Sequence, residues 1–174
     1  DTAPKTAISL SGPVVSASPR SYITSQTQIN LTSSDTYSGV KFTSYSINNL
    51  SQGNYGSPFT LLKTNLDGIY TISYQSQDNL EHLETLRNSQ VYLDNTPPTS
   101  QLLISNPKKE SGNQIYVSSM TEFTMTAADG DGAGVGTQKY IIDGTESDYT
   151  TSFNLSAYPQ GAHTIKCYSI DRLG

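Results

Sequence analysis

Asp129 and Asp131, each followed by a glycine, are the residues whose types and spacing come nearest to metal chemistry. A calcium-binding loop begins in this way, because acidic oxygens on alternate residues can wrap around the ion where glycine allows a tight turn. The EF-hand pattern then fails, since its fifth position is Ala133 and its twelfth, which should be a bidentate glutamate, is Tyr140. The segment therefore predicts an acidic turn and no EF-hand.

Nucleophilic and acid–base chemistry has few candidates. The chain has two histidines and one cysteine, and it contains no Gly-x-Ser-x-Gly motif, phosphate-binding loop or zinc spacing. We interpret His163 as structural, His82 as a solvated loop residue and Cys167 as a small buried apolar side chain. We expect no catalytic residue, no cofactor-binding residue and no enzymatic activity.

The composition excludes two classes of partner. A net charge of -5 disfavours nucleic acid and anionic membrane surfaces, which need clustered lysine and arginine. No apolar stretch approaches the ~20 residues that span a bilayer, so we expect no membrane insertion. The cysteine-poor composition, rich in serine and threonine, is compatible with an extracellular or bacterial envelope location.

Two halves of the sequence are similar, and the matching segments keep their order with offsets of 93 to 95 residues. Drift of this size is what short loop insertions produce. We therefore expect two homologous units, 1–94 and 95–174, separated by the stiff Pro97-Pro98 pair. The matches run from Tyr22 to Val40 against Tyr116 to Val135, from Pro58 to Leu61 against Ser152 to Leu155, and from Asp67 to Asp78 against Gln160 to Asp171.

Apolar residues alternate with polar ones in both units, which predicts half-buried antiparallel strands. Examples are Ile29 with Leu31 and Phe59 with Leu61. Six or seven short strands in about 90 residues favour an immunoglobulin-like β-sandwich. The segment 80–86 is expected to be a loop that leads into the last strand.

Tyr70 lies where such a sandwich would place a tyrosine corner, in which the hydroxyl group bonds back to nearby backbone. The corresponding residue of the second unit is His163, two residues after Gly161. The second unit would therefore have to fix this corner by a different bond.

These motifs resemble the OmpL-type β-domain repeat, which occurs in tandem in bacterial envelope and secreted proteins. The pattern comprises an opening Asp-x-x-Pro, Tyr-Ile/Val-Ser-Ser, Asp-x-x-x-Ser-Gly-Val, Tyr-x-Ile-Asn/Asp, Pro-Phe-x-Leu and Asp-Gly-x-x-Thr-Ile, and it covers nearly the whole chain. The resemblance implies an immunoglobulin-like module used as a spacer or an adhesive surface, sometimes attached to envelope proteins and sometimes to glycosidases. It transfers no catalytic residues.

In a fold of this kind the start of the unit and two of its loops meet at one pole, and aspartates recur at these places. Such carboxylates could bind Ca²⁺ and stiffen the junction between the units, because like charges held close together favour a cation. The alternative is that each aspartate accepts hydrogen bonds within its own turn. The candidates are Asp1, Asp35 and Asp78 in the first unit, and Asp94, Asp129, Asp131 and Asp171 in the second.

We therefore expect two tandem immunoglobulin-like antiparallel β-sandwiches that act as a non-catalytic spacer or adhesion segment of a bacterial cell-surface or secreted protein. The expected partners are neighbouring repeats of the parent chain and host or matrix proteins or glycans. A rival function is that of an accessory, carbohydrate-associated module of a secreted glycosidase. No cofactor is required, and calcium is the one ion that the pattern favours.

The second unit is expected to lack its final strand. Leu80 corresponds to Leu173, and the first unit then continues through Val91 and Leu93 to Asp94, whereas the second stops at Gly174. An open strand edge tends to pair with another strand. We expect truncation of a longer array, with a second unit that is less ordered or pairs with another chain.

Overall fold

The computed structural model describes residues 2–174, and in this range the chain consists of strands and turns without a helix. The predicted all-β class is therefore confirmed. The chain divides into two compact units, with the boundary between Asn95 and Thr96. Among the described residues, no helix is long and apolar enough to cross a membrane.

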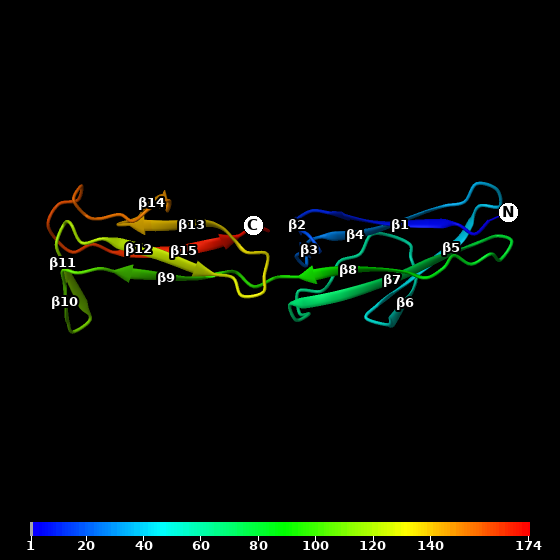
Figure 1. The fold of residues 1–174 in the computed structure, drawn as a ribbon, viewed down its shortest axis with the longest axis horizontal. Coiled ribbons are helices and arrows are strands. Elements are labelled where there is room, and N and C mark those ends of the chain that lie inside the picture. Colours follow the sequence, from blue (N-terminus) through cyan, green and yellow to red (C-terminus); the bar gives the residue numbers. More distant parts are fainter. Residues whose placement is uncertain (1) are drawn as a thin grey trace. The chain divides into compact units, whose positions relative to one another are not determined.

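The strands of residues 2–95 form two sheets (Figure 1). One sheet pairs β1 with β4, and the other has the order β2-β3-β8-β7-β5-β6, in which β3 and β8 run parallel while the other neighbours run antiparallel. The bounds are β1 (Lys5–Ser11), β2 (Val14–Ala17), β3 (Arg20–Ile23), β4 (Gln28–Ser34), β5 (Val40–Ile47), β6 (Leu50–Asn54), β7 (Gly68–Asp78) and β8 (Arg87–Leu93).

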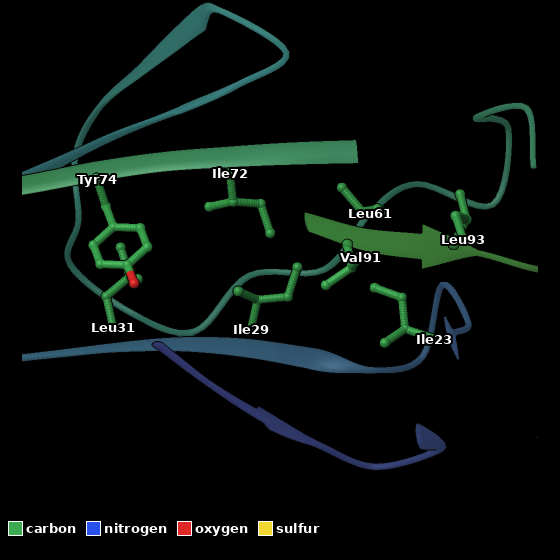
Figure 2. Packing of buried hydrophobic residues seen from close by; sticks show 8 residues of the cluster. All are labelled: Ile23, Ile29, Leu31, Leu61, Ile72, Tyr74, Val91 and Leu93. Carbon is green, nitrogen blue, oxygen red and sulfur yellow. The ribbon is translucent and has the colours of Figure 1, made fainter. Parts of the chain in front are cut away.

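The core of this unit lies between its two sheets. Figure 2 shows Ile29 and Leu31 from β4 pointing toward Ile72 and Tyr74 from β7, with Val91 from β8 beside them. Alternation along β4 explains this arrangement, because successive side chains of a strand point to opposite faces. The buried cluster consists of Ile23, Ile29, Leu31, Leu61, Ile72, Tyr74, Val91 and Leu93.

The strands of the second unit form three small sheets: β9 with β12, β10 with β11, and a three-stranded sheet with the order β14-β13-β15. Its buried cluster is smaller and consists of Phe123, Ile142 and Leu155. The bounds are β9 (Thr99–Ile104), β10 (Lys108–Ser111), β11 (Gln114–Val117), β12 (Phe123–Ala128), β13 (Val135–Ile142), β14 (Thr145–Asp148) and β15 (Ile165–Asp171).

Two local expectations have different outcomes. Residues 80–86 contain no helix and form a loop, as predicted, with a single bridge between Gln77 and Leu83. The expected strand at Phe59 and Leu61 is instead reduced to one bridge between Phe59 and Ile29. Two backbone hydrogen bonds close this bridge, from the Ile29 amide to the Phe59 carbonyl at 2.8 Å and from the Phe59 amide to the Ile29 carbonyl at 3.1 Å. The ring of Phe59 also stacks on Tyr45 at 4.4 Å between centroids, so the segment is held by one bridge and by side-chain packing.

Candidate functional site

Asp35 supports the turn between β4 and β5. Its Oδ2 atom accepts hydrogen bonds from the Tyr37 amide at 3.1 Å, the Ser38 hydroxyl at 3.2 Å and the Gly39 amide at 2.8 Å. Gly39 has a φ of +76°, a left-handed conformation that favours glycine. The carboxylate therefore organises its own turn.

Asp78 is fully buried at the end of β7. Its Oδ1 atom accepts bonds from the Leu80 and His82 amides at 2.9 and 2.8 Å, and its Oδ2 atom lies 2.8 Å from His82 Nδ1. Burial raises the pKa of Asp78, but hydrogen bonds from His82 and Ser38 outweigh it and hold the pKa below its usual value. His82, interpreted from sequence as only solvated, is thus a partner of a buried carboxylate.

The two acidic turns of the first unit are joined through Asn79. Its side-chain amide donates to the Ser38 carbonyl at 2.7 Å, and its backbone amide donates to the Gly39 carbonyl at 3.2 Å. The turn that follows Asp35 and the turn that follows Asp78 therefore lie together, as expected for loops at one pole.

A similar pair of turns is found in the second unit. Asp129 Oδ2 accepts from the Gly134 amide at 2.6 Å, and Asp171 Oδ1 accepts from the Gly174 amide at 2.9 Å. The Arg172 amide donates to the Gly134 carbonyl at 3.0 Å and links the turns. Asp131 is exposed in the first of them.

The remaining calcium candidates are placed differently. Asp94 belongs to the first unit, where it is buried after β8 and donates its amide hydrogen to the Ile23 carbonyl at 2.9 Å. Asp1 lies outside the described residues. Within residues 2–174, no group of three or more His, Cys, Asp or Glu side chains is arranged to hold a metal ion.

The observed bonds of Asp35, Asp78 and Asp129 are those of the turn-supporting alternative. The calcium site itself stays a prediction. Titration of metal-free protein with Ca²⁺ in a calorimeter tests it. Heat of binding and a raised melting temperature would support the site, whereas the absence of both would refute it.

The two predicted corner residues make equivalent bonds. The Tyr70 hydroxyl donates to the Leu66 carbonyl at 2.8 Å, which confirms the predicted bond to backbone. His163 Nε2 lies 2.8 Å from the Pro159 carbonyl oxygen, which is likewise four residues earlier. The second unit therefore fixes the segment before β15 with an imidazole in place of a phenol.

The His163 ring has two acceptors around it. Its Nδ1 atom lies 2.6 Å from Asp143 Oδ2, and neither a carboxylate nor a carbonyl oxygen can donate. Both ring nitrogens must then carry hydrogen, so the bound form is the imidazolium. The hydrogen bond to Asp143, followed by that to Pro159, raises the pKa of His163.

A buried polar cluster of the first unit was missed from sequence. The Thr6 hydroxyl lies 2.6 Å from Ser76 Oγ and donates to Glu84 Oε2 at 2.5 Å, and the Ser76 hydroxyl lies 2.7 Å from Thr43 Oγ1. Glu84 Oε1 also accepts from the Thr6 amide at 3.0 Å and from Arg87 Nε at 2.7 Å. Glu84 therefore ties the loop before β8 to β1.

The second unit holds a reduced form of this cluster. Ser100 Oγ lies 2.7 Å from Ser169 Oγ, at the positions that correspond to Thr6 and Ser76. Gln138, which pairs with Ser169 as Thr43 pairs with Ser76, has a buried Oε1 atom without a hydrogen-bond partner. Recurrence of small hydroxyl residues at these positions was the sequence signal that could have revealed the cluster.

The other chemical candidates are placed in or near the core. Cys167 is half-buried on β15, and burial raises the pKa of its thiol, which keeps it neutral and unreactive.

The tyrosines in the described loops differ in how far they are exposed to solvent. Tyr37 is largely exposed, with an exposed fraction of 80%. Half-buried loop tyrosines are Tyr55, Tyr149 and Tyr158.

No family model and no curated protein matches this sequence. The resemblance to the OmpL-type repeat therefore stays a prediction.

Proposed function

We propose that the chain is a non-catalytic spacer and adhesion segment of a bacterial cell-surface or secreted protein, formed by two tandem immunoglobulin-like β-sandwiches of the OmpL type. The observation that carries the proposal is the recurrence of the same local contacts at an offset of 93 or 94 residues. The matched contacts are Tyr70 to Leu66 and His163 to Pro159, Thr27 to Pro13 and Thr121 to Pro107, and the bridges Ile29–Phe59 and Phe123–Phe153.

Layering and size support the sandwich assignment. In the first unit a buried core is closed between two sheets of mainly antiparallel strands, within about 90 residues. Such a unit exposes its loops at the ends of the strands, and binding in these folds occurs through loops on a rigid scaffold.

The Asp35 turn supports a binding role for one loop. Three hydrogen bonds to one carboxylate oxygen hold this turn, and the turn contains the exposed ring of Tyr37. A tyrosine fixed in a rigid loop offers a large contact area at low entropic cost. We therefore assign the adhesive contact of the first unit to this loop.

Solid-phase binding to extracellular-matrix proteins tests the proposal. We expect the intact chain to bind, the Tyr37→Ala variant to lose binding, and Tyr116→Ala, which removes an exposed ring on β11, to retain it. Absence of binding to all the matrix proteins in the assay would contradict the adhesive role, and absence of glycan binding as well would leave only the spacer.

The alternative is an accessory, carbohydrate-associated module of a secreted glycosidase. The exposed Tyr37 ring favours it as well, because sugars stack on flat aromatic faces. Binding on a glycan array that is sensitive to Tyr37→Ala, together with no binding to matrix proteins, would select this alternative.

A further inference from the structure

We infer that the outer edge of β15 is a docking site for one strand of the β8 type. That strand runs antiparallel to β15 and parallel to β11, and joins the sheets of the second unit into one. This inference rests on the proposed tandem organisation, since the first unit shows what covers the corresponding edge.

The sheet orders carry the first step. In the first unit β8 lies between β7 and β3, within the order β2-β3-β8-β7-β5-β6. The second unit has β10-β11 as one sheet and β14-β13-β15 as another. Removing β8 from the order of the first unit leaves β2-β3 and β7-β5-β6, which correspond to β10-β11 and β15-β13-β14 of the second unit. The described part of the second unit therefore has two strand edges, those of β15 and β11, that one strand could bridge.

Burial along β15 carries the second step. Ile72 and Tyr74 on β7 have exposed fractions of 0% and 5%, because Val91 and Leu93 of β8 pack in the same cluster. Their counterparts on β15 are only half-buried: Ile165 follows Ile72 by 93 residues, and Cys167 follows Tyr74 by the same interval. Apolar side chains on this strand are thus left partly open to water, which is unfavourable.

The polar cluster carries the third step. In the first unit the carboxylate of Glu84, just before β8, accepts from the Thr6 amide and hydroxyl. Ser100 and Ser169 keep the hydroxyl pair of this cluster, and the buried Gln138 Oε1 beside them has no hydrogen-bond partner. A carboxylate at the position of Glu84 would accept from Ser100, as Glu84 accepts from Thr6, whereas Gln138 Oε1 can only accept and needs a donor from the same segment.

The fourth step concerns the turn after β15, which resembles the turn that leads into β8. The Asn79 amide donates to the Gly39 carbonyl, and the Arg172 amide donates to the Gly134 carbonyl. Glu81 has a φ of +73°, and Gly174, its counterpart, has a φ of +98°. The turn at Asp171–Gly174 thus has the same backbone bond and the same left-handed position as the turn that precedes β8.

These steps define the chemistry of the occupant. It is an extended segment with a carboxylate at the position of Glu84 and a basic residue three positions later, like Arg87. Its inner side chains are apolar at two alternate positions, like Val91 and Leu93. Main-chain hydrogen bonds would supply affinity, and the two apolar residues would supply register.

The test extends the intact chain after Gly174 with a copy of residues 82–95. We expect the melting temperature of the second unit to rise by about 5 °C or more, and amide hydrogen exchange on β15 to slow by about tenfold or more. The matched control carries Val91→Ser and Leu93→Ser in the copied segment only, and we expect it to leave both quantities at the values of the unextended chain.

Four outcomes are decisive. Equal melting and exchange in the extended and control chains would overturn the inference, as would an unextended chain that dimerises with its β15 amides already protected by the second copy. Two separate melting transitions with no shift on extension would reject the docking site but leave the tandem organisation standing. A single transition for the whole unextended chain would count against the tandem organisation itself.

Discussion

Asp143 Oδ2 and His163 Nδ1 lie 2.6 Å apart, and this ion pair fixes the segment that leads into β15. The first unit achieves the same end with an uncharged tyrosine. A structural contact that is independent of pH in one unit thus depends on a titrating ring in the other.

This pair makes the stability of the second unit depend on pH. The folded pKa of His163 is raised, so its contribution is fully present below the unfolded value of about 6.5 and is lost as the pH rises through the folded pKa. The pKa of Asp143 is lowered by the bond to His163, so its contribution is lost only as the pH falls through that lower pKa. We expect the melting temperature of the second unit to decline as the pH rises above about 6.5.

His163→Tyr is expected to remove this decline, because a phenol can donate to Pro159 as Tyr70 donates to Leu66. His82→Gln is the matched control for the other histidine and should leave the pH profile of the second unit unchanged. A profile that stays the same after His163→Tyr would contradict the assignment.

Glu84→Ala is expected to lower the free energy of unfolding of the first unit by about 2–4 kcal/mol, because Thr6 loses an acceptor in a buried place and Arg87 loses its partner. Urea denaturation measures the change. Glu81→Ala removes an exposed carboxylate 3.4 Å from Lys41 and should cost less than about 0.5 kcal/mol. Similar costs for the two variants would refute the role of the buried cluster.

Ile72→Ala and Ile165→Ala form a matched pair on β7 and β15. The first should cost about 2–5 kcal/mol, because Ile72 is fully buried. The second should cost about 1–2 kcal/mol, since the half-buried Ile165 loses less area from the core. Denaturant titration of each variant measures the loss in free energy of unfolding. A larger loss for Ile165→Ala than for Ile72→Ala would contradict the prediction.

Asp129→Ala should lower the melting temperature of the second unit even in the presence of a chelator, because the Gly134 amide loses its acceptor. The expected cost is about 1–2 kcal/mol. Asp131→Ala, two residues away and exposed, should change stability by less than about 0.5 kcal/mol under the same conditions. Equal behaviour of both variants, with a loss only when Ca²⁺ is supplied, would instead favour the predicted calcium site.

The all-β class could be predicted because its signals are local. Alternation of Ile29 and Leu31 with polar neighbours is a property of a few adjacent residues, and these residues are buried as expected. The bond of Tyr70 was equally accessible, since its partner is only four residues away.

The hydroxyl positions of the buried cluster recur in the sequence, but the burial of Glu84 among them could not be predicted, because the partners are far apart in the chain. Thr6 and Glu84 are 78 residues apart, and a glutamate in a polar loop is normally solvated. The role of His82 was missed for the related reason that burial of Asp78 depends on the packing of the whole unit. Local patterns indicate strands, but long-range packing decides which polar groups become buried.

Pulling single molecules of the intact chain from its two ends tests most directly whether two sandwiches act in series. Extended chain measures about 3.5 Å per residue, so the two units, residues 1–95 and 96–174, should each release roughly 300 Å in an event of its own. We predict two separate unfolding events of about this size in each trace. One event that releases the whole chain at once would contradict the tandem organisation.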